Sequence, residues 1–205
     1  MMLKRPIAWG FALLAATGAA CAPAAAQSPH QIDRAAADRI MASYDDGIRM
    51  ADEFMRLVPA VAWGMSVRGT YFFLRGNFAA AAKDLALSSD VLDWPDDMIL
   101  LFLARARLGA DGAAELAAGA ARLKTPDWRE AMIELLLGRG TLAEMQATAD
   151  RAGRRCAGLF YAAQWNLLHG QVADATARYR DALDVCPRDG LEYGYAITEL
   201  VRLSQ

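Results

Sequence analysis

The most constraining feature of this 205-residue chain is the segment 155–187, where two apolar-periodic runs flank Gly170. The second run places Tyr179 between two alanines at helical spacing and ends at Pro187. Small residues let helices approach closely, an aromatic side chain fills the space between neighbouring pairs, and proline stops a helix because it has no N–H to donate. The segment therefore predicts an antiparallel helical hairpin that turns at Gly170.

This spacing resembles the tetratricopeptide repeat (TPR), a helical hairpin of about 34 residues that stacks on its neighbours. A second copy lies earlier in the chain, where Gly69 and Gly76 fit the first helix of such a hairpin and its turn. The positions of the second TPR helix are held in the two copies by Val172, Ala175 and Tyr179, and by Phe78, Ala81 and Leu85.

Two degenerate hairpins fit between these copies. Helical patterns at 98–108 and 113–123 form one pair, and patterns at 128–137 and 142–152 form the other. Glycine-containing turns separate the members of each pair, as expected for helices that reverse direction.

The predicted fold class is therefore all-α, a TPR-like helical-hairpin solenoid of about four hairpins over residues 62–205. A helix at 191–203 is expected to cap its C-terminal end. Residues 27–61 are expected to hold a linker and N-terminal helices, with one or two helices within 28–52. No run of the sequence alternates β-branched residues as a strand would.

The first 26 residues are typical of a cleaved export signal. Lys4 and Arg5 precede a short apolar run at 7–14, and small residues precede the predicted cleavage after Ala26. The apolar run is too short for a membrane-spanning helix, which needs about 20 residues. The sequence therefore predicts a signal peptide at 1–26 and a soluble periplasmic protein after cleavage.

Lipidation of Cys21 is the alternative to this cleavage. Small residues precede Cys21, as in lipoprotein signals, but Gly18 stands where such a signal usually has a large aliphatic residue. Cleavage after Ala26 is therefore favoured. Outer-membrane anchoring is expected only if Cys21 is lipidated.

The charge balance argues against a nucleic-acid partner. The formal net charge of the chain is −2, and cleavage would remove Lys4 and Arg5 but no acidic residue. Nucleic-acid phosphates demand a basic surface, which this composition does not supply.

A disulfide is predicted between Cys156 and Cys186. The two residues lie at nearly equal sequence distances from the turn at Gly170, so they face one another across the antiparallel hairpin. An oxidising compartment permits the bond. The alternatives are two buried free thiols or a redox-active pair, and the absence of a Cys-x-x-Cys arrangement argues against the latter.

Side chains for catalysis or metal binding are sparse, so the sequence predicts no enzyme activity, no cofactor and no metal site. His30 follows the cleavage site, and His169 lies in a turn between helices. The sequence shows no cluster of ligands such as zinc requires, and it lacks a nucleophile elbow, a P-loop and a dinucleotide fingerprint.

The acidic pairs are interpreted as structural. Asp96-Asp97 follows Trp94-Pro95, and Asp127 follows Thr125-Pro126, which are both patterns for the first turn of a helix. The pair Asp45-Asp46 precedes Gly47 and is interpreted as a turn or a helix start.

A partner-binding groove is predicted on the inner face of the first helix of each hairpin, which a TPR stack leaves open. Aromatic anchors mixed with small polar groups suit an extended peptide or a partner helix. The residues assigned to this groove are Trp63, Ser66, Thr70, Phe73, Phe160, Gln164 and Leu167.

From about Ala62 to Leu203 the chain resembles the NlpI-like family of periplasmic TPR lipoproteins. The matching residues are Arg68-Gly69, Leu74, Gly76, Phe78, Ala81, Asp84-Leu85, Phe102-Leu103-Ala104, the run 133–138, Phe160-Tyr161-Ala162-Ala163, Ala175, Tyr179, Ala182, Glu192-Tyr193, Ala196 and Glu199-Leu200.

The resemblance implies a non-enzymatic adaptor. Members of that family dock peptidoglycan hydrolases, notably murein endopeptidases, and a periplasmic processing protease; they are lipid-anchored and often dimeric. This chain departs from the family at the weak lipidation site and in its cysteine pair. The alternative hypothesis is a helical domain that binds a small ligand or a glycan, or a stabilising subunit of an envelope enzyme.

Overall fold

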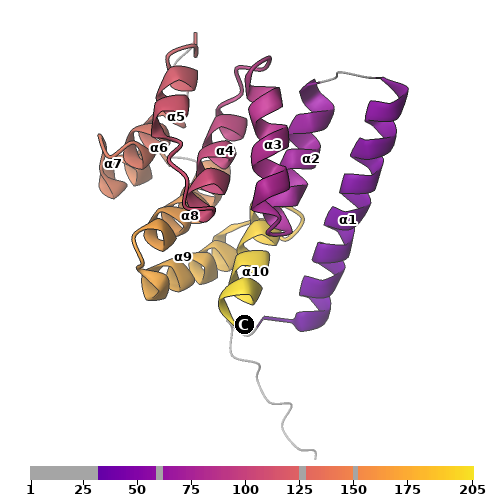
Figure 1. Ribbon diagram of the computed structural model, residues 1–205. Helices are drawn as coiled ribbons and strands as arrows, with labels where there is room; N and C mark the ends of the chain where they lie inside the picture. Colours follow the sequence, from indigo (N-terminus) through magenta and orange to yellow (C-terminus); the bar gives the residue numbers. More distant parts are fainter. Residues whose placement is uncertain (1–31, 59–61, 125–127, 150–151) are drawn as a thin grey trace, which may run out of the picture. The chain divides into compact units, whose positions relative to one another are not determined.

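The computed structural model describes residues 32–58, 62–124, 128–149 and 152–205, and every regular element within them is an α-helix (Figure 1). The predicted all-α fold class is therefore confirmed. The helices are α1 (Arg34–Leu57), α2 (Ala62–Leu74), α3 (Phe78–Ser89), α4 (Pro95–Arg107), α5 (Ala113–Ala120), α6 (Glu130–Leu136), α7 (Leu142–Ala147), α8 (Ala152–Leu168), α9 (Val172–Val185) and α10 (Leu191–Leu203).

Four helical hairpins follow α1, and their turns share one design. The first helix of each hairpin ends at a glycine with positive φ, a conformation that glycine adopts without strain. Backbone N–H groups beyond each turn donate to carbonyls in the last turn of that helix, which is the Schellman pattern. The four glycines are Gly76, Gly109, Gly138 and Gly170.

The predicted close approach of helices within a hairpin is present in the first one. A Cβ added to Gly69 on α2 would lie 2.8 Å from Cγ of Leu85 on α3. In the last hairpin, Tyr179 of α9 is fully buried and its ring lies 6.1 Å from that of Phe160 on α8. The residues that predicted the hairpins from sequence are therefore residues that pack within them.

Helix α10 is more than a cap on the last hairpin. It contacts α8 and α9 but also α1 and α2, near the start of the described chain. Arg202 of α10 donates to the carbonyl of Leu74 at 2.9 Å, and Gly194 allows close approach of the Tyr44 hydroxyl. In an open solenoid each repeat contacts only its neighbours. Here the C-terminal helix joins the first and last hairpins.

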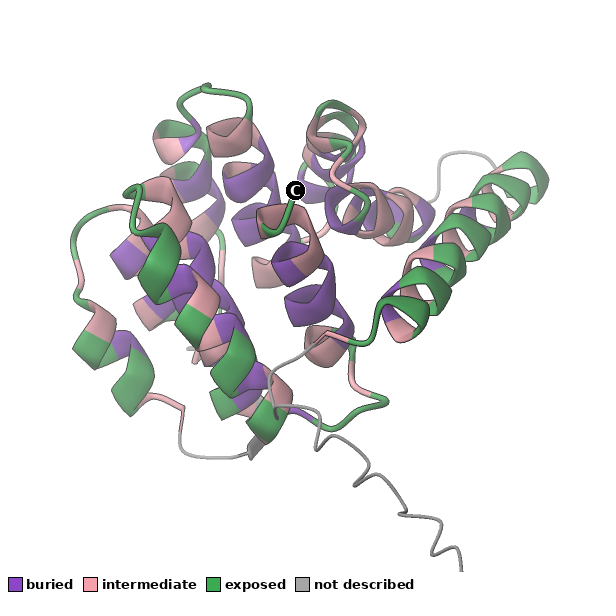
Figure 2. Ribbon diagram, turned by 90° about the horizontal axis from the view of Figure 1, so that it is seen from below, coloured by how far each residue is buried: buried purple, intermediate pink, exposed green. Residues whose placement is uncertain are grey.

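Burial follows this arrangement. Figure 2 shows α10 buried along most of its length, with the other helices around it, whereas the outer face of α1 is exposed. Apolar residues from α2, α4, α8 and α10 form one continuous core. Within residues 32–58, 62–124, 128–149 and 152–205, no helix is both long enough and apolar enough to cross a membrane.

One sequence interpretation is wrong. Asp45, Asp46 and Gly47 lie in the middle of α1, not in a turn or at a helix start. Gly47 is there because Tyr71 of α2 packs against it: an added Cβ would lie 2.4 Å from the Tyr71 ring. Asp45 forms an ion pair with Arg75 at 2.8 Å.

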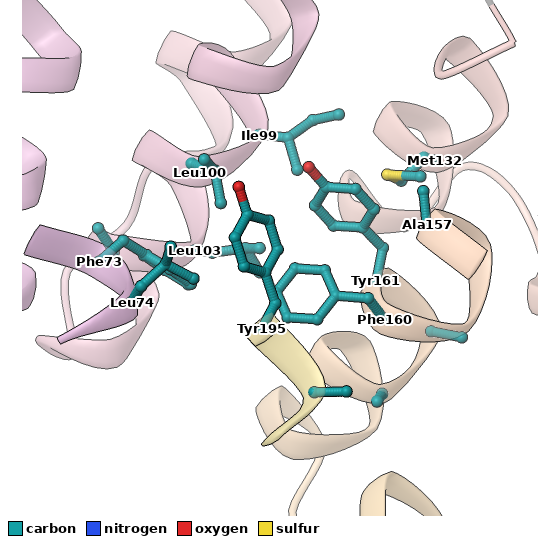
Figure 3. Packing of buried hydrophobic residues seen from close by; sticks show 14 of the residues in the cluster. Phe73, Leu74, Ile99, Leu100, Leu103, Met132, Ala157, Phe160, Tyr161 and Tyr195 are labelled. Atoms are coloured by element: carbon teal, nitrogen blue, oxygen red, sulfur yellow. The ribbon is translucent and has the colours of Figure 1, made fainter. Parts of the chain in front are cut away.

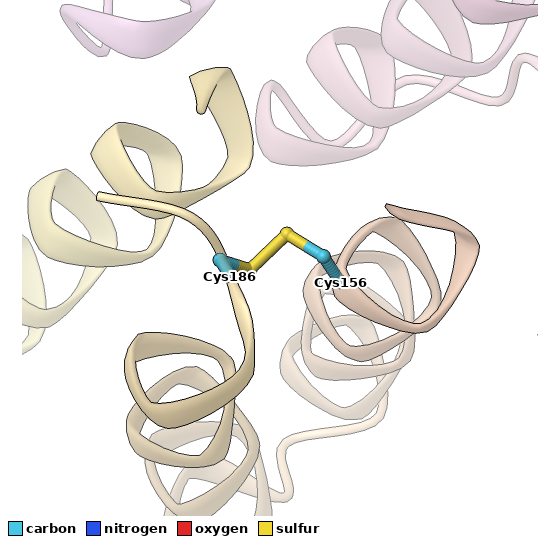
Figure 4. The surroundings of a disulfide bond; sticks show 2 residues. All are labelled: Cys156 and Cys186. Atoms are coloured by element: carbon cyan, nitrogen blue, oxygen red, sulfur yellow. A yellow bond between two sulfur atoms is a disulfide. The ribbon is translucent and has the colours of Figure 1, made fainter. Parts of the chain in front are cut away.

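The predicted Cys156–Cys186 disulfide is present, with a Cα–Cα distance of 5.1 Å (Figure 4). It joins α8 to the residue that follows α9. The last hairpin is therefore closed by the turn at Gly170 at one end and by the disulfide near the other. The predicted export signal, Cys21, His30 and the 125–127 helix start lie outside the described residues.

Candidate functional site

A cavity of about 300 Å³ lies between α2, α4, α8 and α10. Helices α2, α4 and α8 are the first helices of three of the hairpins, and α10 contributes its first turn. The cavity also reaches Trp128 and Arg129, just before α6. Its walls therefore come from segments far apart in the sequence.

Aromatic side chains dominate the cavity wall. Figure 3 shows Phe160, Tyr161 and Tyr195 clustered, with the two tyrosine hydroxyls turned toward Ile99 and Leu100 of α4. Trp94 is 40 % exposed, whereas Phe160 is 1 % exposed, so the cavity runs from an accessible rim to a buried wall. The aromatic lining residues are Tyr71, Trp94, Trp128, Phe160, Tyr161 and Tyr195.

The tyrosine hydroxyls in this wall stay protonated. Burial raises the pKa of Tyr161 and of Tyr195 well above the usual value, and the nearby carboxylates of Asp96 and Glu192 raise both further. A protonated hydroxyl can donate, and Tyr161 lies 3.5 Å from Oδ1 of Asp96.

Asp96 already has a cationic partner. Arg129 donates from Nε at 2.6 Å and from Nη2 at 2.8 Å to the two oxygens of Asp96. The Arg129 guanidinium also lies over the Trp128 ring, 5.0 Å from its centroid. Such bidentate pairs fix geometry as well as charge. Asp96 and Arg129 therefore form a neutral, oriented wall of the cavity.

Asp97 differs from its neighbour, because its partners among the described residues are hydroxyls. The Asp97 side chain is buried, with 2 % of the residue exposed. Ser66 of α2 donates to Oδ1 at 2.8 Å and Ser88 of α3 donates to Oδ2 at 2.7 Å. Burial raises the pKa of Asp97, the two serines oppose that effect, and Asp96 adds to it. Among the described residues, no cation forms an ion pair with this buried carboxylate, which lines the cavity.

A second buried carboxylate, Glu199 of α10, lies outside the cavity and is neutralised. Arg202 lies 2.6 Å and Arg107 3.3 Å from its oxygens, and Gln164 donates to it at 3.0 Å. Both guanidinium groups lie over the Phe78 ring at 5.4 Å. This cluster joins α3, α4, α8 and α10 and serves the fold.

Three of the seven predicted groove residues line the cavity: Ser66, Thr70 and Phe160. Two others are corrected by the structure. Phe73 and Gln164 are completely buried, Phe73 in the apolar core and Gln164 between Arg107 and Glu199. Helical periodicity could not separate the groove face from the core face, because α10 covers part of the predicted groove.

The remaining two predicted groove residues lie elsewhere. Trp63 is 49 % exposed and packs edge-on against Phe54 of α1, with ring centroids 5.4 Å apart. Leu167 is half-buried against the core. Neither belongs to the lining of the cavity.

Sequence reasoning missed the role of Asp97 and Leu191 at this cavity. The segment Trp94-Pro95-Asp96-Asp97 predicts a helix start, and Asp96 and Asp97 do lie in the first turn of α4. The missing information was tertiary, because the serines that hold Asp97 come from two other helices. The signal available in the sequence was that this helix start carries a second carboxylate, Asp97, beside Asp96.

Of the two histidines discussed from the sequence, the structure describes His169. His169 follows α8, its ring stacks on Trp165 at 4.0 Å, and its Nδ1 lies 2.8 Å from the Trp165 carbonyl. Across the part of the chain that the structure describes, no three His, Cys, Asp or Glu side chains converge to hold a metal ion.

Comparison with protein-family models and with curated proteins finds no match for this chain. Its function must therefore be argued from the cavity and the fold.

Proposed function

We propose that this chain is a non-enzymatic periplasmic adaptor that binds a segment of a partner protein at the cavity between α2, α4, α8 and α10. The observation that carries the proposal is the cavity itself, which has a buried aromatic wall and an exposed apolar rim. Binding sites of this form concentrate affinity in a few anchor contacts.

The rim supplies the anchors for a protein partner. Trp94 is 40 % exposed and Leu191 is 61 % exposed, and both line the cavity mouth. An exposed tryptophan beside a partly enclosed cavity is typical of interface hot spots. A partner segment could bury both side chains while one of its own side chains enters the cavity.

The export of the protein is part of the same proposal. The Cys156–Cys186 disulfide is compatible with an oxidising compartment, and the predicted signal at 1–26 would deliver the chain there. The resemblance to NlpI-like adaptors suggests envelope partners such as murein hydrolases or a processing protease. Lipidation of Cys21 and dimerisation are the further properties that this resemblance suggests.

A small-ligand function is the second candidate, and one observation favours it. Four charged residues converge on a cavity of about 300 Å³, which is the lower end of the range for small-ligand sites: Asp96, Asp97, Arg129 and Glu192.

Capture from envelope extract tests the first proposal. Tagged full-length protein, purified without reductant, should enrich a hydrolase or a protease, and Trp94→Ala should abolish this enrichment. Trp63→Ala is the matched control, because Trp63 is similarly exposed but lies outside the cavity. Equal capture by wild type and Trp94→Ala, or loss only in Trp63→Ala, would remove the cavity as the docking site.

A further inference from the structure

Two hydroxyl groups that line the cavity donate their protons to the protein. Ser66 donates to Asp97 at 2.8 Å, and Thr70 donates to the Ser66 carbonyl at 3.0 Å. The Tyr161 hydroxyl lies 3.5 Å from Asp96, beyond the usual length of an O–H···O hydrogen bond. A hydroxyl has one proton and two lone pairs, so Ser66 and Thr70 have committed their protons to the protein. Their oxygen lone pairs can still accept a hydrogen bond from a ligand.

The charges of the residues that line the cavity also favour a ligand that donates hydrogen bonds. Three carboxylates and one guanidinium line the cavity, and the guanidinium of Arg129 is engaged by Asp96. The carboxylates of Asp97 and Glu192 therefore give the lining an excess of negative charge. In a cavity with low-dielectric aromatic walls, an excess of one sign focuses the potential and attracts the opposite charge.

We propose that the cavity binds a cationic N–H donor, an ammonium or guanidinium group, and that its source is a lysine or arginine side chain of the bound partner. The proposal rests on the proposed function for that source. Ser66 relays the charge of Asp97, since its hydroxyl donates to the carboxylate and its lone pairs accept from the ligand.

The aromatic wall suits this ligand as well. A cation is attracted to the face of a tryptophan or tyrosine ring within about 6 Å. Arg129 over Trp128, at 5.0 Å, shows that a ring of this wall already holds one guanidinium. An anionic ligand would face the excess carboxylates without a free donor among these hydroxyls, and a neutral apolar ligand would leave Asp97 without a counter-charge.

Matched small probes test the charge of the ligand. Full-length protein is titrated with butylguanidinium, butylammonium and the neutral isostere butylurea, while NMR follows the indole N–H signals of Trp94 and Trp128. The two cations are expected to bind at least about tenfold more tightly than butylurea, and to weaken as salt is raised. Equal binding of butylurea and butylguanidinium would overturn the inference.

Three variants locate the charge that matters. Asp97→Asn is expected to weaken butylguanidinium binding by about tenfold or more, and Glu192→Gln by a smaller factor. Asp38→Asn makes the same chemical change on the exposed face of α1 and should leave binding unchanged. Because Glu192 is only half-buried in the first turn of α10, its variant remains informative if Asp97→Asn fails to fold. Undiminished binding by both cavity variants would also overturn the inference.

Two peptides identify the source of the cation. The tripeptide acetyl-Ala-Arg-Ala-amide should bind more tightly than butylguanidinium, and its citrulline analogue should not bind. If the tripeptide binds no more tightly than butylguanidinium, the proposed cation binding is retained, but a protein side chain as the source of the cation is rejected. If capture of a partner depends on Trp94 while no cationic probe binds, the proposed adaptor function is retained and the proposed cation site is rejected.

Discussion

Two buried carboxylates in this protein have opposite surroundings. Glu199 and Asp97 are each 2 % exposed. Glu199 lies between Arg107 and Arg202, whereas the described hydrogen-bond donors to Asp97 are the hydroxyls of two serines. A buried charge is ordinarily compensated by an opposite charge within the fold.

The difference separates a structural cluster from a candidate site. The Glu199 cluster provides its carboxylate with two guanidinium groups and joins α10 to three other helices. Asp97 lines a cavity, and its partners in the part of the chain that the structure describes are neutral donors. Such an incomplete compensation beside an accessible cavity marks a candidate ligand site, and we propose that a cationic ligand contributes the missing charge.

Neutralising Glu199 should have the largest effect. Glu199→Gln would leave Arg107 and Arg202 close together with no carboxylate between them. We expect the free energy of unfolding to fall by about 3–5 kcal/mol, as in broken buried ion pairs, measured by urea denaturation. Glu134→Gln, which breaks the exposed pair with Arg139, should change it far less, because exposed ion pairs contribute little to stability. Equal effects would contradict the structural role of Glu199.

Opening the disulfide should come next. Replacing Cys156 and Cys186 by alanine removes a link across a sequence separation of 30 residues and should lower the free energy of unfolding by about 3 kcal/mol. Because Ala157 lines the cavity, weaker binding of a cationic probe is also expected. Wild type unfolded in the presence of reductant should match the variant; unchanged stability on reduction would contradict this prediction.

Removing one donor to Asp97 should have a smaller effect. Ser88→Ala leaves the lining of the cavity intact, because Ser88 is not part of it, but it removes a hydrogen bond of 2.7 Å to the carboxylate. We expect a loss of about 1.5 kcal/mol at neutral pH and a further rise in the pKa of Asp97. Chemical denaturation measures the first effect. No change in stability would show that Ser88 is not a significant donor.

Asp97→Asn should change stability least, by about 1 kcal/mol or less at neutral pH, because it removes an uncompensated charge as well as strong acceptors. Its effect should depend on pH. The pKa of Asp97 is raised from 3.8, so the folded state binds this proton more readily than the unfolded state. The stability that Asp97 contributes is then present below pH 3.8 and lost as pH rises through the raised pKa.

The pH series is the sharper measurement. The stability of wild type relative to Asp97→Asn should decrease as the pH rises from 3.8 and then become constant. A relative stability that increases over that range would mean that the fold compensates Asp97 as it does Glu199.

Local spacing predicted much of the fold. The turn at Gly170, the disulfide and the limits of α10 follow from residues close in sequence, whose spacing specifies which helix faces meet. The middle hairpins were also predicted, although α5, α6 and α7 are short. Their glycine turns carried the signal, because a residue with positive φ in a helix C-terminus favours glycine.

The candidate site was predicted only in part, because its decisive contacts join distant segments. Gln164 was assigned to the groove from its helix face, but it is buried against Arg107 and Glu199, which lie on other helices. Asp97 was recognised as part of a helix start, and nothing in its neighbourhood of the sequence indicates Ser66 or Ser88. The packing of α10 against α8 buries Gln164, and the packing of α2 and α3 against α4 surrounds Asp97.

The most direct test is a carbon-13 NMR titration of the Asp97 carboxyl, assigned with Asp97→Asn, in free protein and in the presence of butylguanidinium. We predict a raised pKa in the free protein and a lower one with the cation bound, because binding and ionisation favour each other. An Asp97 pKa that the cation does not change, at concentrations that saturate the Trp94 signal, would contradict the account.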